Sequence, residues 1–179
     1  MPRSGGLKMV ADLVPARPPR GLLLLVWCGY AAFAVGLLHA LVSVYWAAGG
    51  TAGLDTLGGT LEELARQRDP RLIAIVWLTA GLKLVASVLG LAVVQQWGRR
   101  LPRGLLLVAA WGAATLLVLY GGALTVGQVL VKVGVVAAAP TMNWKAFHWH
   151  LFLWDPWFLA WGLLLAAATW GSARRQRTG

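Results

Sequence analysis

The sequence has few charged residues and very few acidic ones. Only 12% of its 179 residues are charged, and six of them are Asp or Glu. Soluble domains carry about 25% charged residues. A water-soluble core of this length cannot hide the 59% of residues that are hydrophobic, so lipid is the expected solvent. The shortage of charge argues against a soluble enzyme and predicts an integral membrane protein.

Several sites that carry chemistry are also missing. Cys28 is the only cysteine, which excludes disulfide frameworks, Cys-rich metal sites and thiol relays within the chain. The sequence has no phosphate-binding glycine loop, serine nucleophile elbow or paired catalytic carboxylates. His148 and His150 point apart on a helix, and with Asp155 they are too few for a metal signature. No cofactor or metal is predicted, and whether the protein is an enzyme stays open.

Four long apolar runs dominate what is present. Each can cross a hydrocarbon layer of ~30 Å at ~1.5 Å per residue. We therefore predict an all-α fold, a four-transmembrane-helix bundle forming one membrane domain over residues 21–171. Basic tails at 1–20 and 172–179 flank it. The spans are predicted at about 21–48, 72–97, 105–130 and 150–171.

Two local motifs predict where helices begin, one in the first loop and one near the start of the last span. Thr60 followed by Glu63 reads as a capping box and predicts a short interfacial helix to about Arg68 in the first outer loop. Asp155-Pro156 resembles an N-cap followed by Pro at the first helical position. The Trp-rich segment before it is then either an interfacial helix leading into the last span or one continuous helix kinked near Pro156.

The basic residues lie at the ends of the apolar runs and give an orientation. The formal charge is +10, but no soluble basic face is present, so nucleic acid is not an expected partner. The positive-inside rule places both tails and the Arg99–Arg103 turn in the cytoplasm and the loops at 49–71 and 133–148 outside. We expect a multi-pass membrane protein with both termini in the cytoplasm. The first apolar run is too long for a cleaved signal peptide.

Small and polar residues recur on one face of each span. Because lipid offers polar groups no partner, such faces are expected to pack against other helices. The stripes are Ala32, Gly36, His39 and Ser43 in the first span; Thr79, Lys83, Ser87 and Gly90 in the second; Gly121, Thr125, Gln128 and Lys132 in the third; and Gly162, Ala166 and Thr169 in the last.

Lys83 is the most informative of these residues because it lies near the middle of the membrane. A charge there costs several kcal/mol, so it is expected to face the bundle interior. With no acidic residue expected at its depth, the predicted partners are neutral: Tyr120, His39, Gln128 or backbone carbonyls. Two interpretations stay open. Lys83 belongs to an internal hydrogen-bond network, or it awaits an anionic or carbonyl group from a ligand or another subunit.

Most other polar candidates map to the outer half of the bundle, which predicts an outward-facing site. The candidate ligand-binding residues are His39, Tyr45, Trp46, Asp55, Lys83, Tyr120, Gln128 and Asp155.

Motifs in the first outer loop and the last span resemble a known family. They are His39, Tyr45-Trp46, Gly49-Gly50-Thr51, Gly53-Leu54-Asp55, and Trp154-Asp155-Pro156-Trp157 with Gly162. They are similar to those of small bacterial integral membrane proteins, common in actinomycetes and described only as a domain of unknown function. The resemblance covers about residues 22–171 and implies a four-helix membrane protein. It supplies no activity, cofactor or catalytic residue, and Lys83, His148 and His150 lie outside the pattern.

Two hypotheses for function follow. In the first, a non-enzymatic module binds an amphiphile such as a membrane lipid, a partner subunit or a second copy of itself at its outer end. The Gly49–Asp55 loop and the Trp154–Trp157 segment would form that site. In the second, a membrane enzyme or small proton-linked carrier uses His39 and Lys83, as a dimer because four spans are few for a carrier.

Overall fold

The structure is a computed structural model that describes residues 20–175, and the predicted tail residues 1–19 and 176–179 lie outside this range. Within the described range, four helices are long and apolar enough to cross a membrane. The predicted all-α four-helix fold is therefore confirmed. The long helices are α2 (Arg20–Ala47), α4 (Pro70–Ala92), α5 (Arg103–Lys132) and a last helix built from α6 (Trp144–Trp149), the π-helical segment η3 (His150–Trp154) and α7 (Asp155–Arg175).

Three short elements lie in the connections. The loop after α2 holds a 3₁₀ turn, η1 (Leu54–Thr56), and a two-turn helix, α3 (Gly59–Arg66). A second 3₁₀ turn, η2 (Trp97–Arg100), links α4 to α5. The short helix expected in the first loop is thus present as α3.

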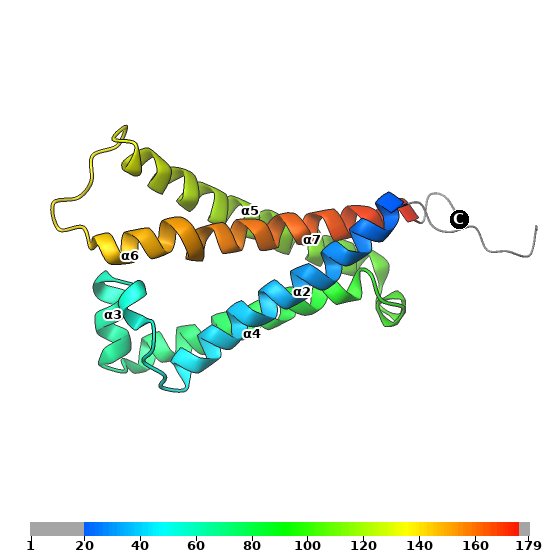
Figure 1. The fold of residues 1–179 in the computed structure, drawn as a ribbon. Helices are drawn as coiled ribbons and strands as arrows, with labels where there is room; N and C mark the ends of the chain where they lie inside the picture. The colour runs from blue at the N-terminus through cyan, green and yellow to red at the C-terminus, as the bar shows by residue number, and fades with distance from the viewer. Residues whose placement is uncertain (1–19, 176–179) are drawn as a thin grey trace, which may run out of the picture.

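The long helices form two hairpins, α2 with α4 and α5 with the last helix (Figure 1). Helix α2 also packs on α7, whereas α4 and α5 touch little. Both ends of the described chain lie at one end of the bundle, which we call the terminal end. The connections that carry α3 and α6 lie at the other, which we call the loop end, and the hairpins diverge toward it (Figure 1).

Close packing at small residues holds the helices together. A Cβ added to Gly36 of α2 would lie 2.4 Å from the Trp161 ring of α7. One added to Gly121 of α5 would lie 2.4 Å from the backbone nitrogen of Leu159, and Gly162 meets Val118 in the same way. These glycines belong to the stripes that the sequence pattern assigns to helix contacts, and they let backbones approach as small residues do in membranes.

Helix α4 begins with a well-formed cap. The Asp69 carboxylate accepts hydrogen bonds from the backbone nitrogens of Arg71 (2.9 Å) and Leu72 (3.0 Å). Pro70 then occupies the first helical position, where its missing N–H costs nothing. The helix ends at Ala92 rather than near Trp97. The chain then turns back so tightly that a Cβ added to Gly98 would lie 1.8 Å from the Ala92 carbonyl oxygen, so only glycine fits there.

The predicted capping box at Thr60 is wrong. Helix α3 begins at Gly59, and its N-cap is Gly58 with no side-chain cap. Gly58 and Gly59 have φ values of 70° and 57°, a region open to glycine but costly for other residues. The two glycines therefore turn the chain into the helix before Thr60 can cap it.

The predicted N-cap at Asp155 is also wrong, and the continuous-helix alternative is correct. Asp155 has helical φ and ψ, and its backbone N–H donates to the carbonyl of His150, five residues earlier. In a regular α-helix the Pro156 ring would clash with the carbonyl four residues earlier. The wider π turn just before it relieves that clash, so the last helix runs unbroken from Trp144 to Arg175.

Substituting Gly121 tests the α5–α7 packing. In Gly121→Val, branched carbons would meet the α7 backbone, which cannot move aside. We expect a loss of about 1–3 kcal/mol in the free energy of unfolding, measured by thermal or denaturant unfolding in detergent. The matched control is Gly112→Val on the same helix, where an added Cβ meets nothing within 4 Å. Equal losses in both variants would contradict the packing argument.

Candidate functional site

The loop that follows α2 folds back onto the end of that helix. The Trp46 indole donates to the carbonyl of Ala52 (2.9 Å), and the Tyr45 hydroxyl accepts from the Ala52 nitrogen (3.2 Å). Gly50 lies flat on the Tyr45 ring, since a Cβ there would sit 2.2 Å from the ring. The side chains of Tyr45 and Trp46 thus hold the loop against the end of α2 through these hydrogen bonds and this ring contact.

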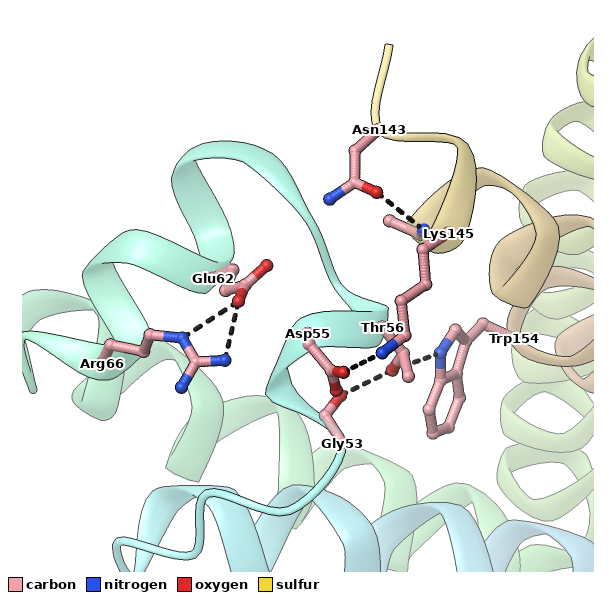
Figure 2. Close-up of polar contacts among 9 residues, drawn as sticks. Gly53, Asp55, Thr56, Glu62, Arg66, Asn143, Lys145 and Trp154 are labelled. Atoms are coloured by element: carbon pink, nitrogen blue, oxygen red, sulfur yellow. Dashed lines mark hydrogen bonds and ion pairs between the residues drawn. The ribbon is translucent and has the colours of Figure 1, made fainter.

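The η1 turn then docks on the last helix, as Figure 2 shows. The Trp154 indole donates to the Thr56 hydroxyl (3.1 Å), which itself donates to the Gly53 carbonyl (2.6 Å). The Lys145 ammonium pairs with the Asp55 carboxylate at the surface. The Lys145–Asp55 and Trp154–Thr56 contacts join residues 90 and 98 positions apart in the chain.

A pocket of about 400 Å³ lies between the loop and the last helix. Its walls are aromatic and aliphatic, and the Asp55–Lys145 pair stands at its rim. The volume falls within the range of small-molecule sites, about 300–1,000 Å³. We call it the loop-end pocket; its walls are Val42, Tyr45, Trp46, Trp149, Leu153 and Trp154.

His39 lies one layer below this pocket in a cage of aromatic rings. It is buried, and its ring centre is 4.3 Å from that of Phe158 and 5.2 Å from that of Trp157. Trp154, which lines the pocket above, is 5.9 Å away. Within the described part of the chain, His39 Nδ1 has no hydrogen-bond partner, so the imidazole is held by ring packing.

Lys83 of α4 faces the bundle interior near the same level. Its Nζ donates to the Ser43 hydroxyl (2.8 Å), which donates to the His39 carbonyl (3.3 Å). The ammonium also lies 5.5 Å from the centre of the Phe158 ring, within cation–π range. The partner is neutral, as expected, but it is Ser43 rather than any of the groups predicted.

A second polar group lies at the start of α7. Asp155 is buried and accepts a hydrogen bond from the Gln128 amide of α5. The imidazole Nδ1 of His150 is 3.4 Å from the same carboxylate. The neighbouring His148 instead contacts Lys132 and the Trp144 carbonyl. The two histidines therefore have different partners.

The structure sorts the eight predicted site residues into four groups. Tyr45, Trp46 and Asp55 meet in the loop-end pocket, whereas His39 and Lys83 lie below it. Gln128 and Asp155 form a pair of their own. Tyr120 is half exposed and contacts Phe158 edge-on, apart from the pocket.

Sequence reasoning missed two residues that complete the site. Lys145 supplies the charge opposite Asp55, and Thr56 is the buried hydroxyl that receives Trp154. One feature of the sequence could have indicated Lys145, because it is the only lysine in the Trp-rich segment at residues 144–157.

The fold and this site define a class, a four-helix membrane protein with an aromatic pocket at one end. The chain belongs to the family described as "Protein of unknown function (DUF3995)", whose model matches residues 36–165. This match confirms the resemblance, noted from the sequence motifs, to a family of unknown function. No curated protein and no solved structure matches the chain.

The contact of Asp55 with Lys145 lowers the pKa of the Asp55 carboxyl, first through the hydrogen bond and then through charge attraction. When folding lowers the pKa of a carboxyl, the stabilising contact is fully present at pH values above the ordinary pKa. The contact is lost as the pH falls through the lowered pKa of the folded protein. The pair therefore remains formed at pH values down to the ordinary pKa of Asp, about 3.9.

We expect the Asp55–Lys145 pair to fix the loop locally. In Asp55→Asn, amide exchange in the η1 turn should rise while global thermal unfolding changes little, because an exposed ion pair adds little to stability. Hydrogen exchange measured by mass spectrometry and corrected for intrinsic rates tests this. Glu62→Gln, which breaks the 2.8 Å pair with Arg66 inside α3, is the control. Unchanged exchange at η1 in Asp55→Asn would contradict the assignment.

Proposed function

We propose that this protein is a non-enzymatic membrane module that binds an amphiphile in the loop-end pocket. The supporting observation is the pocket itself, in which aromatic and aliphatic walls meet one pair of opposite charges at the rim. An apolar chain would lie against Leu153 and the Trp rings. A charged head would lie at Lys145 and Asp55. Apolar cavities with a few converging polar groups are the usual form of ligand sites.

The local backbone supports a ligand site at this place. The π-helical segment η3 carries two of the wall residues, Leu153 and Trp154. Single π turns are rare and occur frequently at functional sites. From this segment, Trp154 packs edge-on against Trp46 of α2, with ring centres 5.5 Å apart.

We also propose that the loop end faces the outside of a bacterial plasma membrane. In the described range, Arg99, Arg100, Arg103 and Arg174 lie at the terminal end without acidic neighbours, whereas the basic residues toward the loop end share it with acidic ones. Those basic residues are Arg66, Arg68, Arg71, Lys132 and Lys145. The positive-inside rule assigns the Arg-rich end to the cytoplasm. An amphiphile would then enter from the outer leaflet.

A pocket-filling variant tests the amphiphile proposal. Val42→Phe places a ring in the cavity, whereas Val126→Phe makes the same change on the exposed face of α5. We expect the wild type and Val126→Phe to carry bound amphiphile through purification, and Val42→Phe to retain about tenfold less, a difference of ~1.4 kcal/mol. Native mass spectrometry and quenching of tryptophan fluorescence by brominated lipid provide the readouts.

Two results would overturn this proposal. One is a wild-type protein that carries no amphiphile and shows no quenching beyond that of Val42→Phe. The other is a stable dimer that loses its association in Val42→Phe, which would assign the pocket to a partner subunit or a second copy.

A second candidate function, a membrane enzyme or proton-linked carrier, rests on the buried His39 imidazole and the intramembrane Lys83. Both are ionisable groups inside the bundle, and such groups are frequently functional. The structure gives Lys83 only Ser43 and a ring as partners within residues 20–175. These partners are those expected of a lysine with a purely structural role as well as of one used by an enzyme or carrier. Substituting Lys83 therefore distinguishes the carrier from the amphiphile-binding module.

We expect Lys83→Met to retain amphiphile binding and to be more stable by up to about 3 kcal/mol, because it removes a charge from the membrane interior. His39→Leu removes a buried nitrogen without a partner and should also keep binding. Thermal unfolding and native mass spectrometry measure both effects, with Lys132→Met at the end of α5 as the control. Loss of binding or of proton flux in Lys83→Met would favour the carrier.

A further inference from the structure

A second cavity lies at the terminal end, remote from the loop-end pocket. It has a volume of about 570 Å³ and lies between the end of α4, the η2 turn, the start of α5 and the last turns of α7. Its polar lining comes from Gln95, Gln96, Arg99, Arg103 and Ser172. The function proposed above does not use it.

Within residues 20–175, the charged residues that line this cavity are positive, and none is acidic. Arg99 and Arg103 both line it, and the five acidic residues of the described range all lie toward the loop end. An isolated pair of arginines on a concave surface attracts anions. Guanidinium groups in particular match the oxygens of phosphate.

Among the described residues, the Arg103 side chain is held by one hydrogen bond, which leaves other guanidinium N–H groups free to bind a ligand. Its guanidinium donates to the backbone carbonyl of Ser172 (3.0 Å), near the end of α7. This bond caps the helix terminus, as basic side chains commonly do, and within residues 20–175 it is the only one that Arg103 makes. A guanidinium has five N–H donors, so the others can serve a ligand.

The floor of the cavity is apolar. Val93 and Leu106 line it and belong to a buried cluster with Ala110 and Ala168. One wall is fixed by the Gln95 amide, which donates to the Tyr30 hydroxyl of α2 (2.8 Å). An apolar floor beneath a basic rim, at the end of four membrane-spanning helices, matches the change from acyl chain to headgroup at a membrane surface.

We propose that the terminal-end cavity binds a phosphate group, with Arg103 and Arg99 as its cationic partners. The phosphate belongs either to the headgroup of an anionic phospholipid, whose chain meets Val93 and Leu106, or to a soluble phosphate compound. Basic pockets between membrane helices commonly take phospholipid headgroups in this way. The inference is independent of the amphiphile proposed for the loop end.

Native mass spectrometry with two lipids of identical chains tests this proposal. Phosphatidylglycerol carries a net negative charge, and phosphatidylcholine carries none. We expect the wild type to retain phosphatidylglycerol preferentially, and Arg103→Gln and Arg99→Gln each to lower that retention about tenfold. The control is Arg100→Gln, which removes the same charge from the same turn at a residue outside the cavity lining. It should change retention by less than about twofold.

Additional measurements distinguish a lipid headgroup from a soluble phosphate compound, and a second variant keeps the test informative if one variant does not fold. If millimolar inorganic phosphate competes with phosphatidylglycerol and raises the melting temperature in an Arg103-dependent manner, the natural ligand is a soluble phosphate compound. If only the lipid acts, the source is a headgroup. Arg99 is exposed and makes no contact with α7 like that of Arg103, so Arg99→Gln is informative even if Arg103→Gln unfolds.

Two outcomes would overturn the proposal. One is an equal loss of phosphatidylglycerol in Arg100→Gln and Arg103→Gln, which would show only general attraction to a basic surface. The other is equal retention of both lipids by the wild type. Val42→Phe should leave phosphatidylglycerol retention at this end unchanged, so failure of the loop-end proposal and failure of this one are distinguishable.

Discussion

The contact of Trp161 with Gly36 joins the two helical hairpins. The indole is fully buried and lies where any side chain at residue 36 would stand. Lipid gives helices no hydrophobic reason to associate, so close packing of this kind must supply the attraction. Helices α4 and α5 make few contacts with each other. The position of α2 along α7 therefore determines how the two hairpins are placed at both ends of the bundle. One turn above Gly36, the same register places His39 among the rings of α7.

Polar groups are arranged by depth in the bundle. Near its middle, Lys83 and Ser87 use only neutral partners on α2, the Ser43 hydroxyl and the Phe33 carbonyl. Toward the loop end, charges appear and join different elements, as Lys145 does with Asp55. Unpaired charge is costly within hydrocarbon and nearly free at the interface. The same depth rule therefore accounts for the aromatic cage around His39 below and the Asp55–Lys145 ion pair at the pocket rim above.

The helices and their inward faces could be predicted from the sequence, but the contacts between them could not. Hydropathy gives the spans, and the spacing of Gly36 and His39 gives the packed face of α2, because both follow from lipid as the solvent. Depth likewise places Tyr120 near Lys83, yet Tyr120 is half exposed and contacts Phe158 edge-on instead of hydrogen-bonding to Lys83. Rotation about the helix axis depends on which helices are neighbours, and sequence periodicity does not contain that information. Asp155 shows the same limit, since tertiary contacts with Gln128 and His150 engage a carboxylate that local rules assign to a cap.

The π turn at His150–Trp154 has a consequence for how this sequence tolerates changes in length. Such a turn holds one residue more than the α-helix around it, and each residue of an α-helix advances the chain by roughly 100°. A π turn rotates less per residue and so absorbs its extra residue within about one turn, and deleting one residue there would restore an ordinary helix with the segments on either side close to their present rotation. Pro156 would then clash with the carbonyl four residues before it, which the π turn now keeps clear. Relatives of this chain are therefore free to vary in the identity of these five residues more readily than in their number.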